Sequence, residues 1–277
     1  MAHTTPSSFD TSSMTRAALD GLAYSSILAG LVAGALVVSV TLALGHPIDA
    51  GLALLALAGT VAVYNVDRLR DRERDRALAP ARTAFVERHA PALRALTGVA
   101  LLVCVACSTR LGGHGFGICA AVLGLGLAHR RLKRLRGIKT AYLACSWLLV
   151  TVGLPALGRA QSPAVGAEAL FWVVAIIGSA VTANLMASNL DRSRLASPPD
   201  PGARRRKLAI SIATAGLGMA FALVGPESVR PLGAVAAAQF IALVRYREGE
   251  AYLARVVDGS LFAGAVTAIA LLIHLRG

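Results

Sequence analysis

Residues 22–45 read LAYSSILAGLVAGALVVSVTLALG and contain no charged side chain. Residues 169–190, ALFWVVAIIGSAVTANLMASNL, form a second uncharged stretch of similar length. A helix of about 20 apolar residues crosses the ~30 Å hydrocarbon core of a bilayer and satisfies its own backbone hydrogen bonds there. Of the 277 residues, 56% are hydrophobic and only 16% are charged, whereas soluble domains carry about 25% charged residues. The sequence therefore predicts an all-α, polytopic membrane protein and argues against a soluble helical domain.

Further apolar runs bring the expected number of transmembrane helices to about nine. The runs lie near residues 21–45, 50–67, 93–109, 115–129, 139–157, 167–190, 208–225, 230–244 and 255–275. Several are short and rich in Ala and Gly, and such small residues let helices approach closely inside a bundle. We expect a single transmembrane domain over residues 16–277, preceded by a disordered, Ser- and Thr-rich segment at residues 1–15.

The net charge of +13 is concentrated in alternate loops. With the N-terminus in the cytoplasm, the cytoplasmic segments contain 24 of the 28 Lys and Arg residues. Such asymmetry predicts an N-terminus inside and a C-terminus outside, and it relates the basic charge to topology and anionic lipid, not to nucleic acid. High Ala, Gly and Arg usage is typical of a bacterial protein, which would place the chain in the inner (cytoplasmic) membrane.

Two predicted span ends resemble each other. Asn65-Val-Asp67-Arg68-Leu-Arg70 closes the second run, and Asn189-Leu-Asp191-Arg192-Ser-Arg194 closes the sixth, an N-x-D-R-x-R match at an offset of 124 residues. An offset of four spans preserves orientation, so it predicts two parallel four-helix repeats, at about residues 16–138 and 139–255, plus a ninth helix. We expect the two matching ends to face each other across a shared cavity.

A stripe of carboxylates follows the first of these ends. Asp67, Asp71 and Asp75 are spaced four residues apart and would lie along one face of a helix. One interpretation is a solvated helix end with ion pairs of little energetic weight. The other is a functional site, because Asp67 lies within or next to an apolar span, where an unpaired carboxylate is costly and usually faces a cavity or a partner.

Two inward carboxylates, Asp67 and Asp191, would suit Mg²⁺, which prefers oxygen ligands and commonly bridges to phosphate. Nearby amides would add carbonyl ligands or orient the carboxylates. The predicted metal-binding set is Asp67, Asp71, Asp75, Asp191, Asn65, Asn184 and Asn189.

A basic segment, residues 130–142, separates the fourth and fifth runs. Most of its charges need no function beyond topology, but Lys139 begins the fifth run and points toward the same predicted cavity. A phosphate held by Mg²⁺ keeps excess negative charge, which Lys or Arg would neutralise. The predicted diphosphate-binding set is Arg68, Arg136, Lys139, Arg192 and Tyr142.

At these residues the chain resembles the UbiA-type intramembrane prenyltransferases, which have nine helices and aspartate-rich motifs after the second and sixth. The resemblance includes the Lys133-Arg134 to Lys139 loop and the Val256-Val257-Asp258-Gly259 stretch that opens the ninth run. It implies a central cavity, Mg²⁺ and an isoprenoid diphosphate whose tail lies among the helices.

Residue by residue, Asp67, Asp71 and Asp75 match the first motif of that family. The second motif is degenerate: Asp191 remains, while Leu195 and Pro199 stand where the internal repeat would place carboxylates.

The leading hypothesis is an Mg²⁺-dependent membrane transferase that moves a prenyl group from its diphosphate to a lipophilic acceptor, such as an aromatic compound, with Asp67, Asp71 and Lys139 as catalytic residues. The degenerate second motif favours an alternative, a non-catalytic relative that binds an isoprenoid lipid or a partner protein. A terpene cyclase is weaker because aromatic residues make up only 5% of the chain. A transporter is weaker because the charges lie at helix ends and not at the midplane.

Overall fold

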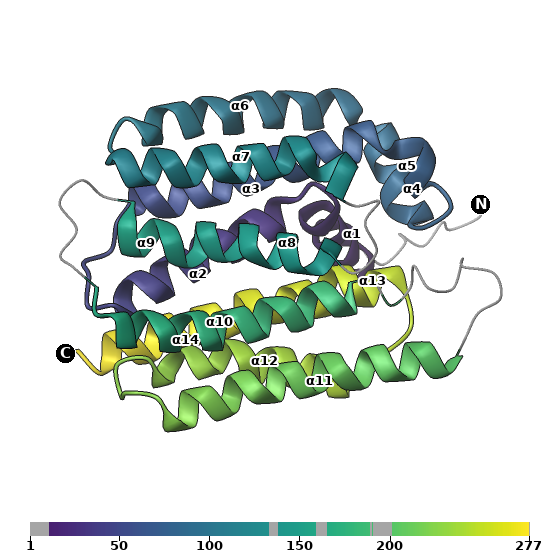
Figure 1. The fold of residues 1–277 in the computed structure, drawn as a ribbon. Coiled ribbons are helices and arrows are strands. Elements are labelled where there is room, and N and C mark those ends of the chain that lie inside the picture. Colours follow the sequence, from purple (N-terminus) through teal and green to yellow (C-terminus); the bar gives the residue numbers. More distant parts are fainter. Residues whose placement is uncertain (1–10, 133–137, 159–164, 189, 191–200, 277) are drawn as a thin grey trace, which may run out of the picture.

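The computed structural model describes residues 11–132, 138–158, 165–188, 190 and 201–276. The described residues are almost entirely helical and contain no β-strand. The long helices run side by side in one bundle, and α1 lies at the opposite end of the bundle from the end of α14 (Figure 1). The predicted all-α fold class is confirmed.

The long helices are α2 (Ile27–Ala43), α3 (Ala50–Arg70), α6 (Ala90–Ser108), α7 (Gly113–Leu132), α10 (Ala167–Ala187), α11 (Pro201–Val224), α12 (Gly233–Val244) and α14 (Asp258–His274). The shorter helices are α1 (Thr11–Tyr24), α4 (Arg72–Asp75), α5 (Pro80–Arg88), α8 (Ile138–Leu148), α9 (Leu154–Leu157) and α13 (Glu250–Tyr252). Short turns of other helix types connect these helices. They are the π-helical η1 (Leu149–Gly153) and η4 (Leu253–Val257), and the 3-10 turn η3 (Arg230–Leu232).

Six of the described helical segments are long and apolar enough to cross a membrane, and a seventh is added if the bent pair α1–α2 counts as one span. Two further apolar helices, Gly113–Gly126 and Arg230–Val244, are shorter. Several such helices in one chain make it an α-helical membrane protein.

The first apolar run does not form the single helix expected at residues 21–45. The chain breaks after Tyr24, and the two parts of the run differ in direction by 72°. Ser26 lies at the break with φ 66° and ψ 4°, the left-handed region that costs an L-residue roughly 1–2 kcal/mol. As a result α1, which begins at Thr11 inside the segment predicted as disordered, crosses the end of the bundle instead of extending α2.

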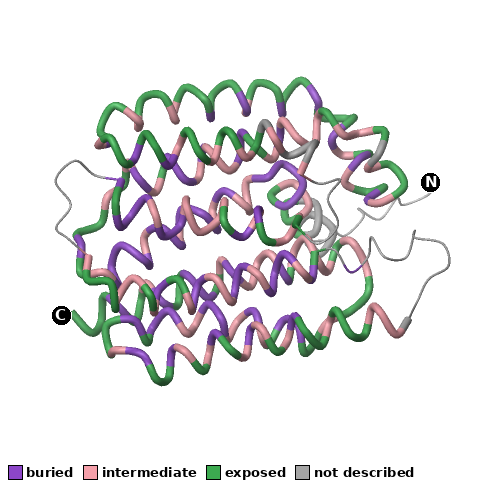
Figure 2. Tube along the Cα trace, in the orientation of Figure 1, coloured by how far each residue is buried: buried purple, intermediate pink, exposed green. Residues whose placement is uncertain are grey.

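The core lies around α10, which packs against α8, α11 and α12. Figure 2 shows buried residues concentrated on α2, α10, α12 and α14, whereas the outer face of α6 is exposed. Leu36, Ile176, Ile177 and Val235 are fully buried in this core, while Leu102 on α6 is 71% exposed. Exposed apolar side chains on a membrane helix face lipid tails, which are as apolar as the protein interior.

Short elements gather at one end of the bundle. There α1, α4, α5 and α13 surround the C-terminal ends of α3, α10 and α12, and we call this region the basic end (Figure 1). Its arginines include Arg68, Arg82, Arg204, Arg245 and Arg255. The basic end also holds the described residues that the sequence proposes as functional.

Candidate functional site

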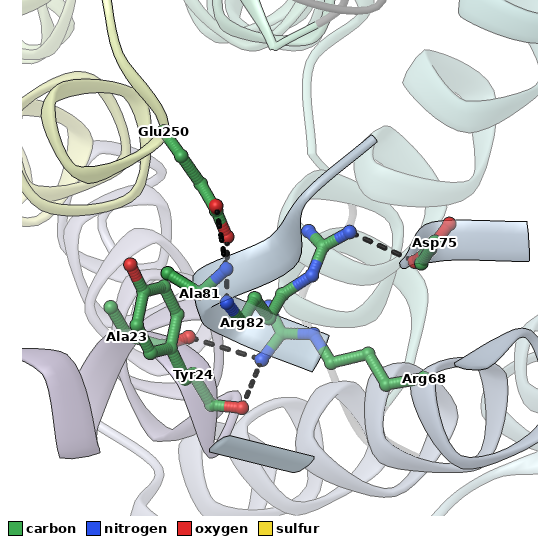
Figure 3. A network of polar contacts seen from close by, with 7 residues as sticks. All are labelled: Ala23, Tyr24, Arg68, Asp75, Ala81, Arg82 and Glu250. Carbon is green, nitrogen blue, oxygen red and sulfur yellow. Dashed lines mark hydrogen bonds and ion pairs between the residues drawn. The ribbon is translucent and has the colours of Figure 1, made fainter. Parts of the chain in front are cut away.

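Arg68 connects α3 to α1. Its Nη1 atom donates hydrogen bonds to the carbonyl oxygens of Ala23, at 3.0 Å, and Tyr24, at 2.6 Å (Figure 3). The last carbonyls of a helix lack intrahelical partners, and a positive charge beside them is stabilising. Arg68, which the sequence assigns to diphosphate binding, therefore holds the end of α1 in this structure.

Arg82 of α5 approaches the same place. Its Nη2 donates to Asp75 Oδ2 at 2.8 Å, and the two side chains are only 23% and 15% exposed. The backbone N–H groups of Ala81 and Arg82 donate to the carboxylate of Glu250, at 3.3 Å and 2.9 Å (Figure 3). A carboxylate at the start of a helix is favourable, so Glu250 ties α13 to α5. Asp75, predicted as a metal ligand, is in this structure the ion-pair partner of Arg82.

The aspartate stripe follows the helical spacing that the sequence predicts. The backbone N–H of Asp71 donates to the carbonyl of Asp67 at 2.9 Å, and that of Asp75 donates to Asp71 at 2.9 Å. The helical hydrogen-bond pattern thus continues past the end of α3. Asp67 and Asp71, both partly buried, leave the backbone one helical turn apart.

Asn184 positions a carboxylate that the sequence assigns to no role. Its Nδ2 donates to the carbonyl of Val257 at 3.1 Å and to Asp258 Oδ1 at 3.2 Å. Asp258 begins α14 directly after the π-helical turn η4, and such turns are frequent at functional sites. The charges of Arg68 and Arg82 act on its carboxylate, so α3, α5, α10 and α14 all contribute to one cluster.

A polar path leads from this cluster into the bundle. The Ser260 hydroxyl lies 2.8 Å from the carbonyl of Val257 and 2.6 Å from Oε1 of Gln239 on α12. Gln239 is fully buried, and its Nε2 has no hydrogen-bond partner in the described part of the chain. Polar groups inside a membrane bundle usually mark function. The feature of the sequence that could have indicated these residues is the carboxylate of Asp258 within the last apolar run.

The remaining described residues of the predicted sets are Asn65, Lys139 and Tyr142. Asn65 is fully buried, and its Oδ1 accepts a hydrogen bond from Ser26 at 2.7 Å. Lys139 and Tyr142 lie in the first turns of α8, partly buried and buried. Further along α8, Trp147 Nε1 donates to the Tyr64 hydroxyl at 3.1 Å, which links α8 to α3.

Four predicted residues, Arg136, Asn189, Asp191 and Arg192, lie outside the described residues, as do Lys133 and Arg134. The second motif and the shared cavity therefore stay predictions. One surface hollow, about 560 Å³, lies at the opposite end of the bundle, beside Gly113 and Leu157. Another, about 410 Å³, lies between α12 and α14.

No group of three or more His, Cys, Asp or Glu side chains in the described ranges could hold a metal ion. Mg²⁺ needs fewer protein ligands, because it keeps several waters and commonly uses one or two carboxylates together with substrate phosphates. Asp67 and Asp71, one turn apart at the end of α3, fit that limited requirement.

Charge at the basic end also includes exposed pairs. Arg76 donates to Glu87 at 2.5 Å, and this hydrogen bond raises the pKa of the Arg76 guanidinium. With its side chain 66% exposed, this pair lies in solvent beside the buried cluster and contributes little stability.

Comparison with known protein families, with curated proteins and with solved structures finds no match for this chain. Its function must therefore be argued from the cluster itself. The cluster combines two partly buried guanidinium groups with carboxylates on α4 and α14, at the end of an apolar helical bundle. Such a boundary can bind an amphiphile with an anionic head and an apolar tail.

Proposed function

We propose that this protein is an integral-membrane transferase that moves a prenyl group from an isoprenoid diphosphate to a lipophilic acceptor, such as an aromatic compound. The observation that carries the proposal is the cluster of Arg68, Arg82 and Asp258, contributed by α3, α5 and α14, which meet at the same end of an apolar bundle that carries Asp67 and Asp71. An isoprenoid diphosphate has the matching shape and charge, with an anionic head for the arginines and a tail for the helices.

The membrane arrangement is part of the proposal. The six long segments, the bent pair α1–α2 and the two shorter apolar helices would together make nine spans. The basic end would then face the cytoplasm of a bacterial cell, in agreement with the positive-inside rule. The N-x-D-R-x-R match after the second and sixth apolar runs supports two parallel repeats.

The chemistry would use the residues of the basic end to hold the leaving group. Arg68 and Arg82, together with Lys139, would bind the phosphate oxygens by charge-assisted hydrogen bonds. Bound Mg²⁺, held by Asp67 and Asp71, would offset negative charge on the diphosphate. The bond between the prenyl carbon and the diphosphate oxygen breaks with its electron pair on the oxygen. The acceptor then bonds to that carbon and gives its proton to water.

Release of pyrophosphate from geranyl, farnesyl and geranylgeranyl diphosphate by the detergent-purified protein tests the proposal. With Mg²⁺ and an acceptor we expect release, and Asp71→Asn should lower its rate about 100-fold, as loss of one electrostatic contact to a developing charge typically does. Glu73→Gln is the matched control, because Glu73 lies two residues along the chain and is exposed. A folded protein that releases no pyrophosphate from any of the three substrates would refute the transferase.

A specific observation favours a second candidate, a non-catalytic isoprenoid-binding protein. Arg68 and Asp75 already make contacts that hold α1 and α5 in place, so a purely structural role accounts for both. Thermal unfolding separates the candidates. Stabilisation by neutral isoprenoids without metal supports the binder, whereas Mg²⁺-dependent stabilisation by prenyl diphosphates supports the enzyme.

A further inference from the structure

Two like charges meet at the basic end. The side chains of Arg68 and Arg82 extend from α3 and α5 into the same space beside α1 (Figure 3). The two positive charges are close enough to repel each other. Bringing two cations together in a partly buried place is unfavourable unless negative charge compensates them.

The two arginines have different kinds of partner. Asp75 forms an ion pair with Arg82, and the charges of Asp75 and Asp258 also act on Arg68. The hydrogen bonds that Arg68 donates to Ala23 and Tyr24 end on neutral carbonyl oxygens. A hydrogen bond from a guanidinium to a phosphate oxygen is roughly twice as strong as one between neutral groups. An entering anion would therefore compete well for Arg68.

We propose that Arg68 and Arg82 together form an anion site that binds the oxygens of a diphosphate directly, without a metal ion, and that the α1 carbonyls and Asp75 occupy the two arginines when the anion is absent. The identity of the physiological ligand rests on the proposed function; the anion site itself does not. The planar, five-donor guanidinium is the side chain best suited to phosphate in two-point contact, and two of them match the two phosphate groups.

The site has a structural consequence. Arg68 makes one of the contacts that hold α1 across the basic end. Other such contacts include the ion pair between Arg255 and Asp20 and, just beyond α1, the hydrogen bond between Ser26 and Asn65. An anion that takes over Arg68 leaves the last carbonyls of α1 unbonded, so hydrogen exchange of the α1 amides should accelerate when the anion binds.

Binding of inorganic pyrophosphate to the detergent-purified full chain in EDTA, measured by calorimetry, tests the site. Arg82→Gln and Arg68→Gln should each raise Kd at least about tenfold, because each removes a charge-assisted contact. Arg76→Gln is the matched control: Arg76 also pairs with a carboxylate, that of Glu87, but its side chain is 66% exposed, and its loss should leave Kd unchanged.

Asp75→Asn gives a change of opposite sign. It frees Arg82 from its competing carboxylate, so pyrophosphate should bind about threefold more tightly or better in EDTA. A misfolded variant cannot produce tighter binding, which separates the site from general damage. EDTA is required because a metal-ligand role of Asp75 would reverse the sign in Mg²⁺.

The outcomes separate this site from the transferase. Unchanged Kd in Arg82→Gln, weaker binding in Asp75→Asn, or binding that occurs only with Mg²⁺ would overturn the direct anion site. A protein that binds pyrophosphate through these arginines but releases none from prenyl diphosphates keeps the site and loses the transferase. Turnover that is insensitive to Arg82→Gln keeps the transferase and loses the site.

Discussion

Helices α3 and α10 both reach the basic end with a buried asparagine near their C-terminal ends, and the two asparagines hold different neighbours. Asn65 on α3 accepts a hydrogen bond from Ser26 and so supports the break between α1 and α2. Asn184 on α10 donates to Val257 and Asp258, and so fixes a carboxylate at the start of α14. One amide secures a backbone turn, and the other positions a charged group.

The chain also continues differently after the two helices. After α3 the chain continues through α4 and α5, where the ion pair between Asp75 and Arg82 keeps it against the bundle. Helix α10 ends at Ala187, and its polar contact runs instead to the last helix of the chain. The packing of the helices in the bundle therefore determines which side chains come together at the basic end.

The largest effect is expected for Asn184→Ala. This change removes the amide donor from the carboxylate of Asp258 and from the carbonyl of Val257, which keeps its contact with Ser260, and it should lower the free energy of unfolding by about 2–3 kcal/mol. If Asp258 works in the proposed reaction, pyrophosphate release should fall as well. Denaturant unfolding in detergent micelles and the release assay measure the two quantities.

Asn65→Ala is the matched comparison, because it removes the same amide from the other helix end. Asn65 Nδ2 has no hydrogen-bond partner among the described residues, so only the bond from Ser26 is lost and a cost near 1 kcal/mol is expected. If both substitutions lowered the free energy of unfolding equally and neither changed pyrophosphate release, the two asparagines would not differ in role.

An intermediate effect is expected at Ser26. Ser26→Ala loses the bond to Asn65 but keeps a β-carbon at φ 66°, whereas Ser26→Gly loses the same bond and adopts this backbone conformation without steric cost. Ser26→Gly should therefore be more stable than Ser26→Ala by about 1 kcal/mol in thermal unfolding. If alanine equals or exceeds glycine, the break between α1 and α2 is not under the backbone strain described above.

The smallest effect is expected for Asp20→Asn, which removes the ion pair between Asp20 and Arg255. Both side chains are partly exposed, so less than about 1 kcal/mol is expected. Hydrogen exchange of the α1 amides should accelerate slightly at low salt, and the difference should vanish at high salt.

Glu227→Gln at the far end of the bundle is its control, since Glu227 is 90% exposed in its pair with Arg230. If Asp20→Asn accelerated hydrogen exchange of the α1 amides as much as Arg68→Gln does, then Asp20, and not Arg68, would make the main contact that holds α1.

Hydropathy located the long helices well. The runs at 50–67, 93–109 and 167–190 correspond to α3, α6 and α10, with ends that differ by a few residues. Hydropathy did not locate α4 and α5, because they lie in a highly charged segment whose apolar residues do not recur at helical spacing. It also missed the break at Ser26, because that turn depends on a hydrogen bond to a residue 39 positions away.

The candidate site was predicted in part. The four-residue spacing of Asp67, Asp71 and Asp75 recurs in their backbone hydrogen bonds, although Asp71 itself lies between α3 and α4 and the three residues do not share one continuous helix. The contacts of Arg68 with the α1 carbonyls, of Arg82 with Asp75 and of Asn184 with Asp258 were not predicted. Each joins elements that no local pattern relates.

The sequence by itself determined that the chain is a helical membrane protein, because uncharged runs of about 20 residues have few alternatives in lipid. It also determined the helical spacing of the aspartate stripe. Only the tertiary structure decided that α1 folds back across the basic end, that Arg68 and Arg82 share one space, and that Asp258 joins them. The physical reason is range: hydrophobicity and helical period are encoded over a few consecutive residues, whereas these polar contacts depend on which distant helices pack together.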